Sequence, residues 1–583
     1  MDRRLFLASC ASAAAVSAAP FPDQTSPSRV DATGGDVRLE RIWKDGVCTS
    51  RLHNRGKEPA RVAQVVLFQW KHNLSPETEI YGESFQMLSQ TGGTLAKPVD
   101  FGYSEPKHYR IPQPDGVTAV SGLLRLSPAG RHMLLAWTSC RRFHGRFFIS
   151  PGQIEAILDT EGLVLEPGKS WEMEEFRFGI SQSLASGLNI VADAINRNHP
   201  PLRFPAPPAG WCSWYCFGPR VTAENVRANL ASIRQTTPSL RYIQIDDGYQ
   251  PAMGDWLDTG KAFGGNVQSV LKEIRAQGFE PAIWVAPFIA QADSKVFEDN
   301  PDWFMKGEDG NPIPSNRVTF GGWRFGPWYA MDGTHPGVQQ HFETLFRTMR
   351  REWGVTYFKL DANFWGAMHG GRLHDPNATR IEAYRRGMEA VRRGSGDAFL
   401  LACNHPMWAS FGLIHGSRSS ADISRKWKTF EEIARQNLSR NWQNGKLWWN
   451  DPDAVTLSGS LPEEEYRFHA TVAFASGGMI LSGDDLTTLP PDRLKMLHAL
   501  LPVTGRAARF EETNLRIGIT DLADGRRAYS LFNWTEQPQR FQVALERKRK
   551  VRELWTGQDF GEREGRLEIP DVPAHGGRVL IAG

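Results

Sequence analysis

The chain has few cysteines and no long hydrophobic run, and each absence excludes a class of protein. It holds 6 cysteines in 583 residues, and an odd number remains if an N-terminal segment containing Cys10 is removed. A sparse, odd set of cysteines is not the disulfide framework of a small secreted domain. No apolar run reaches the ~18 residues that a membrane helix requires, so we predict no membrane span.

The chain also lacks a strong net charge and the common metal-binding motifs. Lysine and arginine together number 68, against 65 aspartates and glutamates, which gives a net charge of +3. This balance gives no reason to expect a nucleic-acid partner. The sequence holds no Cys-x-x-Cys pair and no His-Glu-x-x-His site, so no metal and no organic cofactor is implied.

What remains is an ordinary globular composition with many aromatic residues. Apolar residues make up 40% and charged residues 23% of the chain, and its length suggests about three or four domains. The 20 tryptophans are compatible with carbohydrate binding, because indole faces stack on the C–H faces of sugars. Large β-sheet domains also bury many aromatic residues, and composition alone favours this second explanation.

Residues 1–20 have the pattern of an export signal. Arg3 and Arg4 precede an apolar, alanine-rich stretch, and small residues at positions 16–19 offer a cleavage site. The start resembles a twin-arginine signal, and a general secretory signal that happens to contain two arginines is the alternative. We expect this segment to be removed and the protein to be exported, either to the periplasm or out of the cell.

Three zones follow along the chain. Residues 31–198 consist of short alternating apolar runs separated by turn residues, which predicts a β-sandwich. Residues 199–209 are rich in proline and predict a linker. Short apolar runs alternate with amphipathic segments in residues 210–501, and short strands return in residues 502–583, which predicts a small C-terminal β-domain.

The central zone predicts eight strand–helix units. The candidate strands are residues 210–214, 240–246, 280–285, 355–361, 398–403, 417–422, 446–450 and 479–482, and the helical segments between them include 222–235, 267–277, 336–353, 378–393 and 424–443. Eight such units in about 290 residues fit a (β/α)8 barrel. A doubly wound open sheet is the alternative, but no Gly-x-Gly-x-x-Gly turn follows the first strand.

Carboxylates stand at the ends of several predicted strands. Asp246-Asp247, Asp361 and Asp422 end the second, fourth and sixth strands, and Asp451 follows the seventh. The C-terminal ends of barrel strands face the active site. One aspartate after a strand is usually a helix cap or a turn residue, but several on one rim beside tryptophans suit glycoside hydrolysis. That reaction needs one carboxylate as nucleophile and a second as general acid.

The central zone resembles the retaining α-galactosidases of glycoside hydrolase families 36 and 27, the melibiase clan. The likeness covers roughly residues 210–507 and rests on eight segments in family order: GWCSWY at 210–215, IDDGY at 245–249, GDW at 254–256, IWVAP at 283–287, NPDWF at 300–304, YFKLD at 357–361, RSSADI at 418–423 and NDPD at 450–453. The flanking β-domains also fit family 36.

The resemblance implies the two catalytic roles. Asp361 would be the nucleophile that forms a covalent glycosyl-enzyme, and Asp422 would be the general acid/base. Lys359 lies two residues before Asp361, so both side chains point to one face of the strand, and its charge would help to keep Asp361 ionised. Arg418 would contact the region of the sugar's 2-hydroxyl, with an ordinary salt bridge to a nearby carboxylate as the alternative.

The resemblance also implies the residues that bind the sugar. Asp246 and Asp247 would bind the 4- and 6-hydroxyls, and Trp214 and Trp284 would line the sugar subsite. Trp256 would reach in from the loop after the second strand, with a place in the hydrophobic core as an equal alternative. Cys403 would lie near the 2-position, with a free buried cysteine as its alternative.

Two positions depart from the family pattern. Phe288 stands where family 36 commonly has glutamate, and Asn404-His405-Pro406 replaces a glycine-rich turn after the fifth strand. In such enzymes this loop selects between a 2-hydroxyl and a 2-acetamido group, so the retaining mechanism is better supported than the identity of the sugar. The chain is also shorter than many family 36 enzymes, which leaves a homo-oligomer open.

We therefore predict a retaining α-galactosidase that acts on terminal α-galactosides in an oligosaccharide or polysaccharide. An α-N-acetylgalactosaminidase, a β-L-arabinopyranosidase and a transglycosylase resembling raffinose synthases are alternatives on the same fold. A carbohydrate-binding barrel without activity is the alternative of another class. A nucleophile with an acid/base argues against it, because binding alone requires neither.

Overall fold

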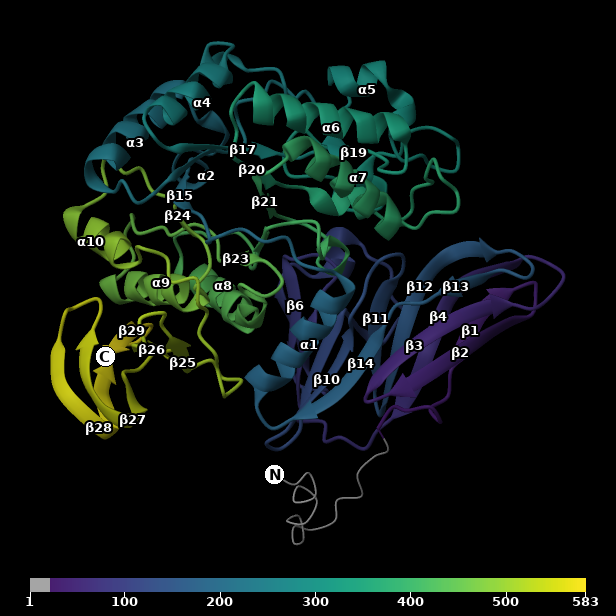
Figure 1. The fold of residues 1–583 in the computed structure, drawn as a ribbon, viewed down its shortest axis with the longest axis horizontal. Coiled ribbons are helices and arrows are strands. Elements are labelled where there is room, and N and C mark those ends of the chain that lie inside the picture. The colour runs from purple at the N-terminus through teal and green to yellow at the C-terminus, as the bar shows by residue number, and fades with distance from the viewer. Residues whose placement is uncertain (1–20) are drawn as a thin grey trace, which may run out of the picture.

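The computed structural model describes residues 21–583, and the predicted export signal lies outside the described residues. Three units make up the chain (Figure 1): an N-terminal β-domain, a central barrel and a C-terminal β-domain. The N- and C-terminal domains both pack against one side of the barrel. The fold class predicted from the sequence is confirmed.

The N-terminal domain is a sandwich of two antiparallel sheets. The five-stranded sheet runs β1 (Arg29–Thr33), β4 (Ala60–Lys71), β12 (Gln153–Leu165), β11 (His144–Ser150), β8 (Thr118–Ser121). The nine-stranded sheet runs β13 (Ser170–Glu172), β3 (Val47–Asn54), β14 (Phe176–Ser181), β10 (His132–Trp137), β9 (Leu123–Ser127), β5 (Glu79–Glu83), β6 (Ser89–Gly93), β7 (Pro98–Gly102), with β2 (Val37–Lys44) on β3.

The alternation of side chains explains why the two sheets pack face to face. Along β3 every second residue is buried, as a period of two requires. Phe68 of one sheet meets Phe176 of the other with ring centroids 4.9 Å apart. Helix α1 (Leu184–Asn198) then closes the domain, capped by the Ser183 hydroxyl, which accepts from the Ser186 amide at 3.3 Å. The sequence analysis did not predict this helix.

The barrel contains eight parallel strands in chain order: β15 (Ala209–Cys212), β16 (Tyr242–Ile245), β17 (Glu280–Val285), β20 (Tyr357–Leu360), β21 (Phe399–Ala402), β22 (Gly416–Arg418), β23 (Trp449–Asp451) and β24 (Ile480–Ser482). The last strand pairs with the first. The Met479 amide donates to the Asn450 carbonyl at 2.8 Å, which joins the remaining two edges. Every strand lies where it was predicted, although most are shorter.

Helices surround the barrel: α2 (Trp214–Phe217), α3 (Ala223–Thr236), α4 (Val267–Ala276), α5 (Lys295–Asp299), α6 (Pro336–Arg351), α7 (Arg380–Ser395), α8 (Trp427–Ser439), α9 (Glu463–Ser476) and α10 (Pro491–Ala499). Thr222 and Thr379 begin α3 and α7 with capping boxes. In α6, Val338, Phe342 and Leu345 lie on one buried stripe, as expected for a helix covering a sheet. No helix among the described residues is long and apolar enough to cross a membrane.

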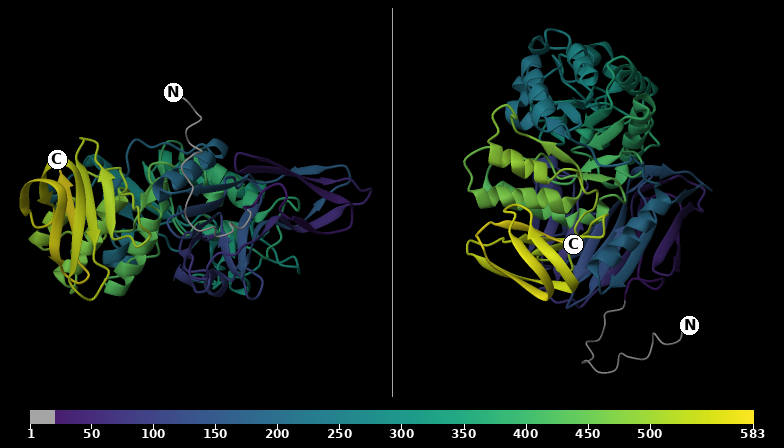
Figure 2. Two further views of the ribbon diagram at one scale, coloured as in Figure 1. Left: turned by 90° about the horizontal axis from the view of Figure 1, so that it is seen from below. Right: turned by 60° about the vertical axis from the view of Figure 1, so that its left-hand side comes forward.

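The C-terminal domain is a five-stranded antiparallel sheet in the order β25 (Ile517–Asp521), β26 (Arg527–Phe532), β29 (Gly577–Ala582), β27 (Gln539–Glu553), β28 (Asp559–Val572). It has a small core of its own around Leu531, Phe541 and Leu580. Figure 2 shows this sheet beside the barrel, where β29 contacts α9.

One segment of the N-terminal domain pairs with the barrel at the mouth. The Met87 amide donates to the His405 carbonyl at 3.0 Å, and the Met407 amide donates to the Phe85 carbonyl at 2.8 Å. His405 and Met407 belong to the loop after β21, where the sequence departs from the family pattern that the barrel resembles. The departure therefore coincides with a contact between domains.

Candidate active site

A cavity of about 240 Å³ opens at the C-terminal ends of the barrel strands. Eight of the site residues predicted from the sequence line it: Asp246, Asp247, Lys359, Asp361, Cys403, Asp422, Trp214 and Trp284. The remaining two, Arg418 and Trp256, are buried outside its lining. The barrel therefore brings residues from six different strand ends to one hollow of monosaccharide size.

The candidate nucleophile Asp361 directly follows β20. The indole N–H of Trp284 donates to its Oδ2 at 3.1 Å, and the Ala362 amide donates to its Oδ1 at 2.7 Å. Burial raises the pKa of Asp361 above its usual value, while the positive charge of Lys359 acts in the opposite direction. The two donors fix the orientation of the carboxylate, which a nucleophile requires.

Lys359 and Asp246 form a buried ion pair behind the nucleophile. Lys359 Nζ lies 2.9 Å from Asp246 Oδ2, and both side chains are less than a tenth exposed. Burial acts most strongly, to lower the pKa of Lys359, but the charges of Asp246, Asp361 and two nearby thiols together outweigh it, and the pKa lies well above its ordinary value. Gln244 also donates to the same oxygen at 2.6 Å. Lys359 is thus a permanent cation beside Asp361.

Asp247 is held by an arginine that the sequence analysis missed. The Arg324 guanidinium binds its carboxylate with two donors, Nε at 3.1 Å and Nη2, and Gln250 donates at 2.7 Å. Burial raises the pKa of Asp247, and the hydrogen bonds and charge of Arg324 oppose this shift. The carboxylate predicted to bind sugar hydroxyls therefore already has a cationic partner.

Arg324 belongs to a glycine-rich loop, residues 321–327, that reaches the mouth of the cavity. Gly322 has φ +121°, and a Cβ there would lie 2.6 Å from the ring of Trp328. Only glycine can therefore fold the loop over this tryptophan. Trp323 lines the cavity and is 41% exposed, and Phe325 is 52% exposed. The signal that could have identified this loop from the sequence is the segment GGWRFGP, in which aromatic residues stand among glycines.

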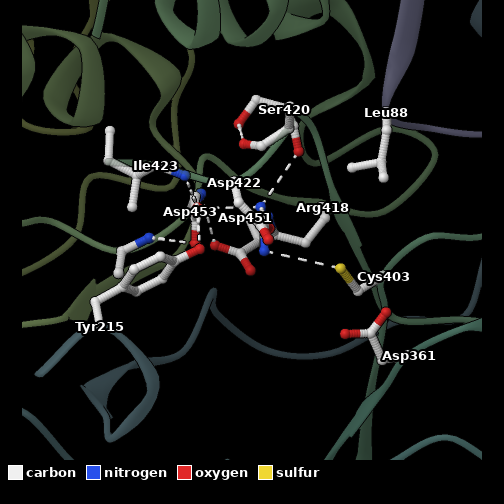
Figure 3. Close-up of polar contacts among 12 residues, drawn as sticks. Leu88, Tyr215, Asp361, Cys403, Arg418, Ser420, Asp422, Ile423, Asp451 and Asp453 are labelled. Carbon is white, nitrogen blue, oxygen red and sulfur yellow. Dashed lines mark hydrogen bonds and ion pairs between the residues drawn. The ribbon is translucent and has the colours of Figure 1, made fainter. Parts of the chain in front are cut away.

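The candidate acid/base Asp422 lies on the loop after β22, because that strand ends at Arg418 rather than at residue 422. Its side chain is 56% exposed, and Arg418 Nη2 binds its Oδ1 at 2.9 Å (Figure 3). Arg418 is only 1% exposed and also binds Asp453 at 3.0 Å. Arg418 thus forms the salt bridge that was its alternative, and its contact with the sugar stays a prediction.

Asp453 is the buried centre of this network, and the sequence analysis did not name it as a site residue. Its Oδ2 accepts from the Tyr215 hydroxyl at 2.5 Å and from the Ile423 amide at 2.7 Å. Its backbone has φ +74°, a strained value for a residue with a side chain. Burial raises the pKa of the neighbouring Asp451 to about 6. Asp451 and Asp453 both belong to the NDPD segment at residues 450–453, which was the sequence signal for them.

Cys403 and Trp256 occupy different places relative to the cavity. In Figure 3 Cys403 lies between the side chains of Arg418 and Asp361, and it is a free thiol, like Cys212 and Cys216. Trp256 packs edge-on against Trp284 with ring centroids 5.5 Å apart, and it is 1% exposed. The predicted reach of Trp256 into the site is corrected to the core alternative.

The N-terminal domain supplies one wall of the cavity, which the sequence analysis did not foresee. Leu88, Tyr103, His108 and Tyr109 all line it. The His108 ring stacks on Tyr103 and on Phe320 of the barrel, with centroids 4.6 Å and 3.9 Å apart. No motif in the predicted β-domain marked these residues, because their role depends on how two domains dock.

Asn404 is hydrogen-bonded to the wall that the N-terminal domain supplies. The Tyr109 hydroxyl donates to the Asn404 side-chain oxygen at 2.8 Å, and Asn404 lines the cavity beside Cys403. Phe288, the other departure, is fully buried against Phe342 and Tyr384, and it is not part of the cavity lining. Within residues 21–583 no group of three or more His, Cys, Asp and Glu is placed to hold a metal ion.

Comparison with known proteins agrees with this geometry. Residues 243–388 match the Melibiase family model. The chain is 30% identical over 167 residues to the myogenesis-regulating glycosidase of Mus musculus, an alignment that covers 28% of this chain and 22% of that protein. It is 27% identical over 187 residues to the α-galactosidase of Escherichia coli, with 28% and 25% covered. The alignments thus span about a quarter or less of each of these relatives.

Solved structures extend the likeness over the whole fold. The α-galactosidase of Thermus thermophilus, solved with p-nitrophenyl α-D-galactopyranoside, superposes with a TM-score of 0.64 at 22% identity, covering 84% of this chain and 98% of that one. The galactosidase domain of AgaSK gives 0.66 at 12% identity, with 97% and 84% covered. The β-L-arabinopyranosidase of Geobacillus stearothermophilus gives 0.50 at 18% identity, with 65% and 96% covered.

Fold and site together define a multidomain (β/α)8 barrel with carboxylates at its mouth. Within that class, residues 243–388 match the Melibiase family model, and the likeness to melibiase-like α-galactosidases read from the sequence is confirmed.

Proposed function

We propose that the protein is a retaining glycoside hydrolase that releases terminal α-linked galactose. The observation that carries this proposal is the shared cavity of Asp361 and Asp422, with the Lys359 cation beside the first of them. The melibiase match and the fold of the Thermus thermophilus α-galactosidase support the choice of sugar. A cavity closed by a second domain suits a terminal residue rather than the middle of a polymer.

The chemistry follows from the environments of the two carboxylates. Asp361 attacks the anomeric carbon while Asp422 donates a proton to the leaving oxygen, and a covalent β-glycosyl-enzyme results. Asp422 then takes a proton from water, which attacks the same carbon and restores the α configuration. The charge of Lys359 favours the ionised form of Asp361 against the effect of its burial. Retaining enzymes hold the two carboxyl groups about 5–5.5 Å apart.

The test is the hydrolysis of p-nitrophenyl α-galactopyranoside with the product followed by NMR. We expect turnover, with α-galactose formed first and the β anomer only later by mutarotation. Release of β-galactose first would contradict the retaining mechanism. Binding without turnover over a broad panel of aryl glycosides would favour the carbohydrate-binding alternative instead.

A second candidate activity is the hydrolysis of β-L-arabinopyranosides. The observation that favours it is the Arg324 clamp on Asp247, because a carboxylate already bound by two guanidinium donors has less capacity for the hydroxyl of a galactose hydroxymethyl group. Arabinopyranose lacks that group. The ratio of the two p-nitrophenyl glycosides, measured with and without a sugar acceptor, separates these activities from each other and from transglycosylation.

The proposed substrates are galactoside oligosaccharides or the side chains of polysaccharides, and the proposed location is outside the cytoplasm. Stachyose and raffinose occur in complexes of structurally similar α-galactosidases. The sequence pattern of residues 1–20 supports export. Fractionation of producing cells and sequencing of the mature N-terminus would test it, and an unprocessed protein in the cytoplasm would contradict it.

A further inference from the structure

A second and larger cavity, of about 700 Å³, lies where the three domains meet. Its walls come from β5 and β9 of the N-terminal domain, from α1, from the end of α8 and the segment before β23, and from the start of the C-terminal domain. The Thr513 hydroxyl donates to Glu79 at 2.6 Å across this junction. The cavity shares no lining residue with the candidate active site.

Arg125 on β9 is the unusual feature of this cavity. Among the described residues its side chain makes no hydrogen bond and no ion pair, and its Nε is buried without a partner. Its guanidinium lies 5.4 Å from the centre of the Tyr81 ring. Burial lowers the pKa of Arg125. Because removing a cation from water is costly, arginines in such places normally bind a carboxylate or another acceptor.

Three further cations line the same cavity. Lys446 donates to the neutral side chain of Asn189, and Arg506 donates to a backbone carbonyl at 3.3 Å. Arg509 is paired with Asp521, the single acidic residue in the lining. Asp521 is shared with Arg527 outside the cavity. The lining therefore holds four cations and one carboxylate. Three carboxylates outside the lining also act on these cations: Glu79 on Arg125, Asp193 on Lys446 and Glu511, 3.8 Å from Arg509. The wall itself carries an excess of positive charge, which attracts anions.

The rest of the wall carries the groups that bind sugars. Trp442, Trp449 and Phe510 contribute aromatic surface, and Asn189 and Asn444 contribute amides. Aromatic faces bind the C–H side of a pyranose, while amides and guanidinium groups bind its hydroxyls and acid groups. The volume lies within the range of small-molecule sites and exceeds that of the active-site cavity.

We propose that this interdomain cavity is a second binding site, for an oligosaccharide that carries carboxylate or sulfate groups. Arg125 binds one acid group, and Lys446 and Arg506 bind the others. The site does not depend on the proposed hydrolysis. It would hold an acidic glycan on the enzyme while the terminal sugar of a chain enters the barrel.

The experiment uses the full chain with Asp361→Ala, which prevents turnover. Binding is measured by calorimetry for a galacturonate tetrasaccharide, for the uncharged galactose tetrasaccharide and for sodium sulfate. We expect the galacturonate to bind, more weakly as salt is raised, and Arg125→Met to weaken it roughly tenfold or more. Arg38→Ala, which removes a 61% exposed arginine of the same domain, is the matched control and should change nothing.

Thermal unfolding distinguishes a binding arginine from a structural one. Without ligand, Arg125→Met should melt at the same temperature or higher, because it removes a half-buried cation that forms no salt bridge with a described residue, and Lys446→Met should weaken binding as a second variant. Equal binding of both tetrasaccharides, or binding that Arg125→Met does not affect, would overturn the proposal. Sulfate binding as tightly as the tetrasaccharide would overturn the saccharide assignment, and a lower melting temperature for Arg125→Met would make Arg125 structural.

Discussion

At the scale of single residues, the two candidate catalytic carboxylates differ in their surroundings. Asp361 is fixed by two hydrogen-bond donors, and burial raises its pKa against the charge of Lys359. Asp422 is 56% exposed and bound by a single arginine. One carboxylate is thus oriented by fixed donors, and the other is exposed to solvent. This is the division of labour that a nucleophile and an acid/base require.

Replacement of Asp361 tests the nucleophile. Asp361→Ala should lower turnover of p-nitrophenyl α-galactopyranoside by at least ~10³-fold, because no covalent intermediate forms. Azide should enter the vacated space and give β-galactosyl azide, identified by NMR. Asp422→Ala is the matched control: it should keep some activity on substrates whose leaving group needs no proton. Formation of the α-azide from the Asp361 variant would contradict the assignment.

Replacement of Lys359 tests its effect on the nucleophile. In Lys359→Met the pKa of Asp361 should rise further, because burial then acts unopposed. Asp361 must be ionised to attack, so the acidic limb of the kcat/KM profile should move to higher pH. Lys359→Arg keeps the charge and should largely restore the profile. An acidic limb that stays in place in Lys359→Met would show that this cation does not set the ionisation of Asp361.

At the scale of elements, the sequence predicted where strands lie better than where they end. The alternation and length of apolar runs locate all eight barrel strands, because burial on both faces leaves a clear pattern. The predicted end of β22 was wrong. Residues 419–422 leave the sheet because Arg418 and the Ile423 amide bind Asp453 on the next loop. That contact is tertiary, and no local pattern encodes it.

Asp453→Asn tests whether this network positions the acid/base. With the charge of Asp453 removed, Arg418 should draw Asp422 into a closer pair and hinder proton donation. We expect kcat to fall about 10–100-fold for an unactivated galactoside, a part of the ~10²–10⁴-fold that general acid–base catalysis contributes, and to change little for a dinitrophenyl galactoside. Asp451→Asn neutralises a buried neighbour that makes no hydrogen bond to Arg418, and it is the control. An equal loss on both substrates would indicate damage to the fold only.

At the scale of the whole molecule, the active-site cavity forms because the N-terminal domain packs against the barrel. The residues that could be named from the sequence all lie on the barrel, whose motifs are local. Leu88, Tyr103, His108 and Tyr109 could not be named, because nothing in their own segment shows that it will cover a barrel that begins 100 residues after Tyr109 in the chain. Arg324 was missed for a related reason, since its partner Asp247 lies on another strand end.

The joint between the N-terminal domain and the barrel rests on a buried ion pair. Arg440 Nη2 binds Glu83 at 2.7 Å, and both side chains are 0% exposed. The same guanidinium donates to the Ser419 carbonyl at 3.1 Å, in the loop that leads to Asp422. Glu83→Gln keeps the shape of the side chain but leaves the arginine charge unbalanced. We expect it to destabilise the protein by about 3–5 kcal/mol and to lower kcat, because the loop loses its anchor.

Urea unfolding followed by fluorescence measures the first effect, and hydrolysis at a temperature where the variant is folded measures the second. Glu172→Gln is the matched control: it removes the same charge from the Arg51–Glu172 pair, whose side chains are 51% and 70% exposed. A solvent-exposed ion pair contributes about 0–1 kcal/mol to the free energy of unfolding. The Glu172 variant should therefore unfold at almost the same urea concentration as the parent protein. If the two variants unfold alike, the buried pair does not hold the domains together. If Glu83→Gln unfolds early but keeps full kcat when folded, the pair holds the domains without positioning the catalytic loop.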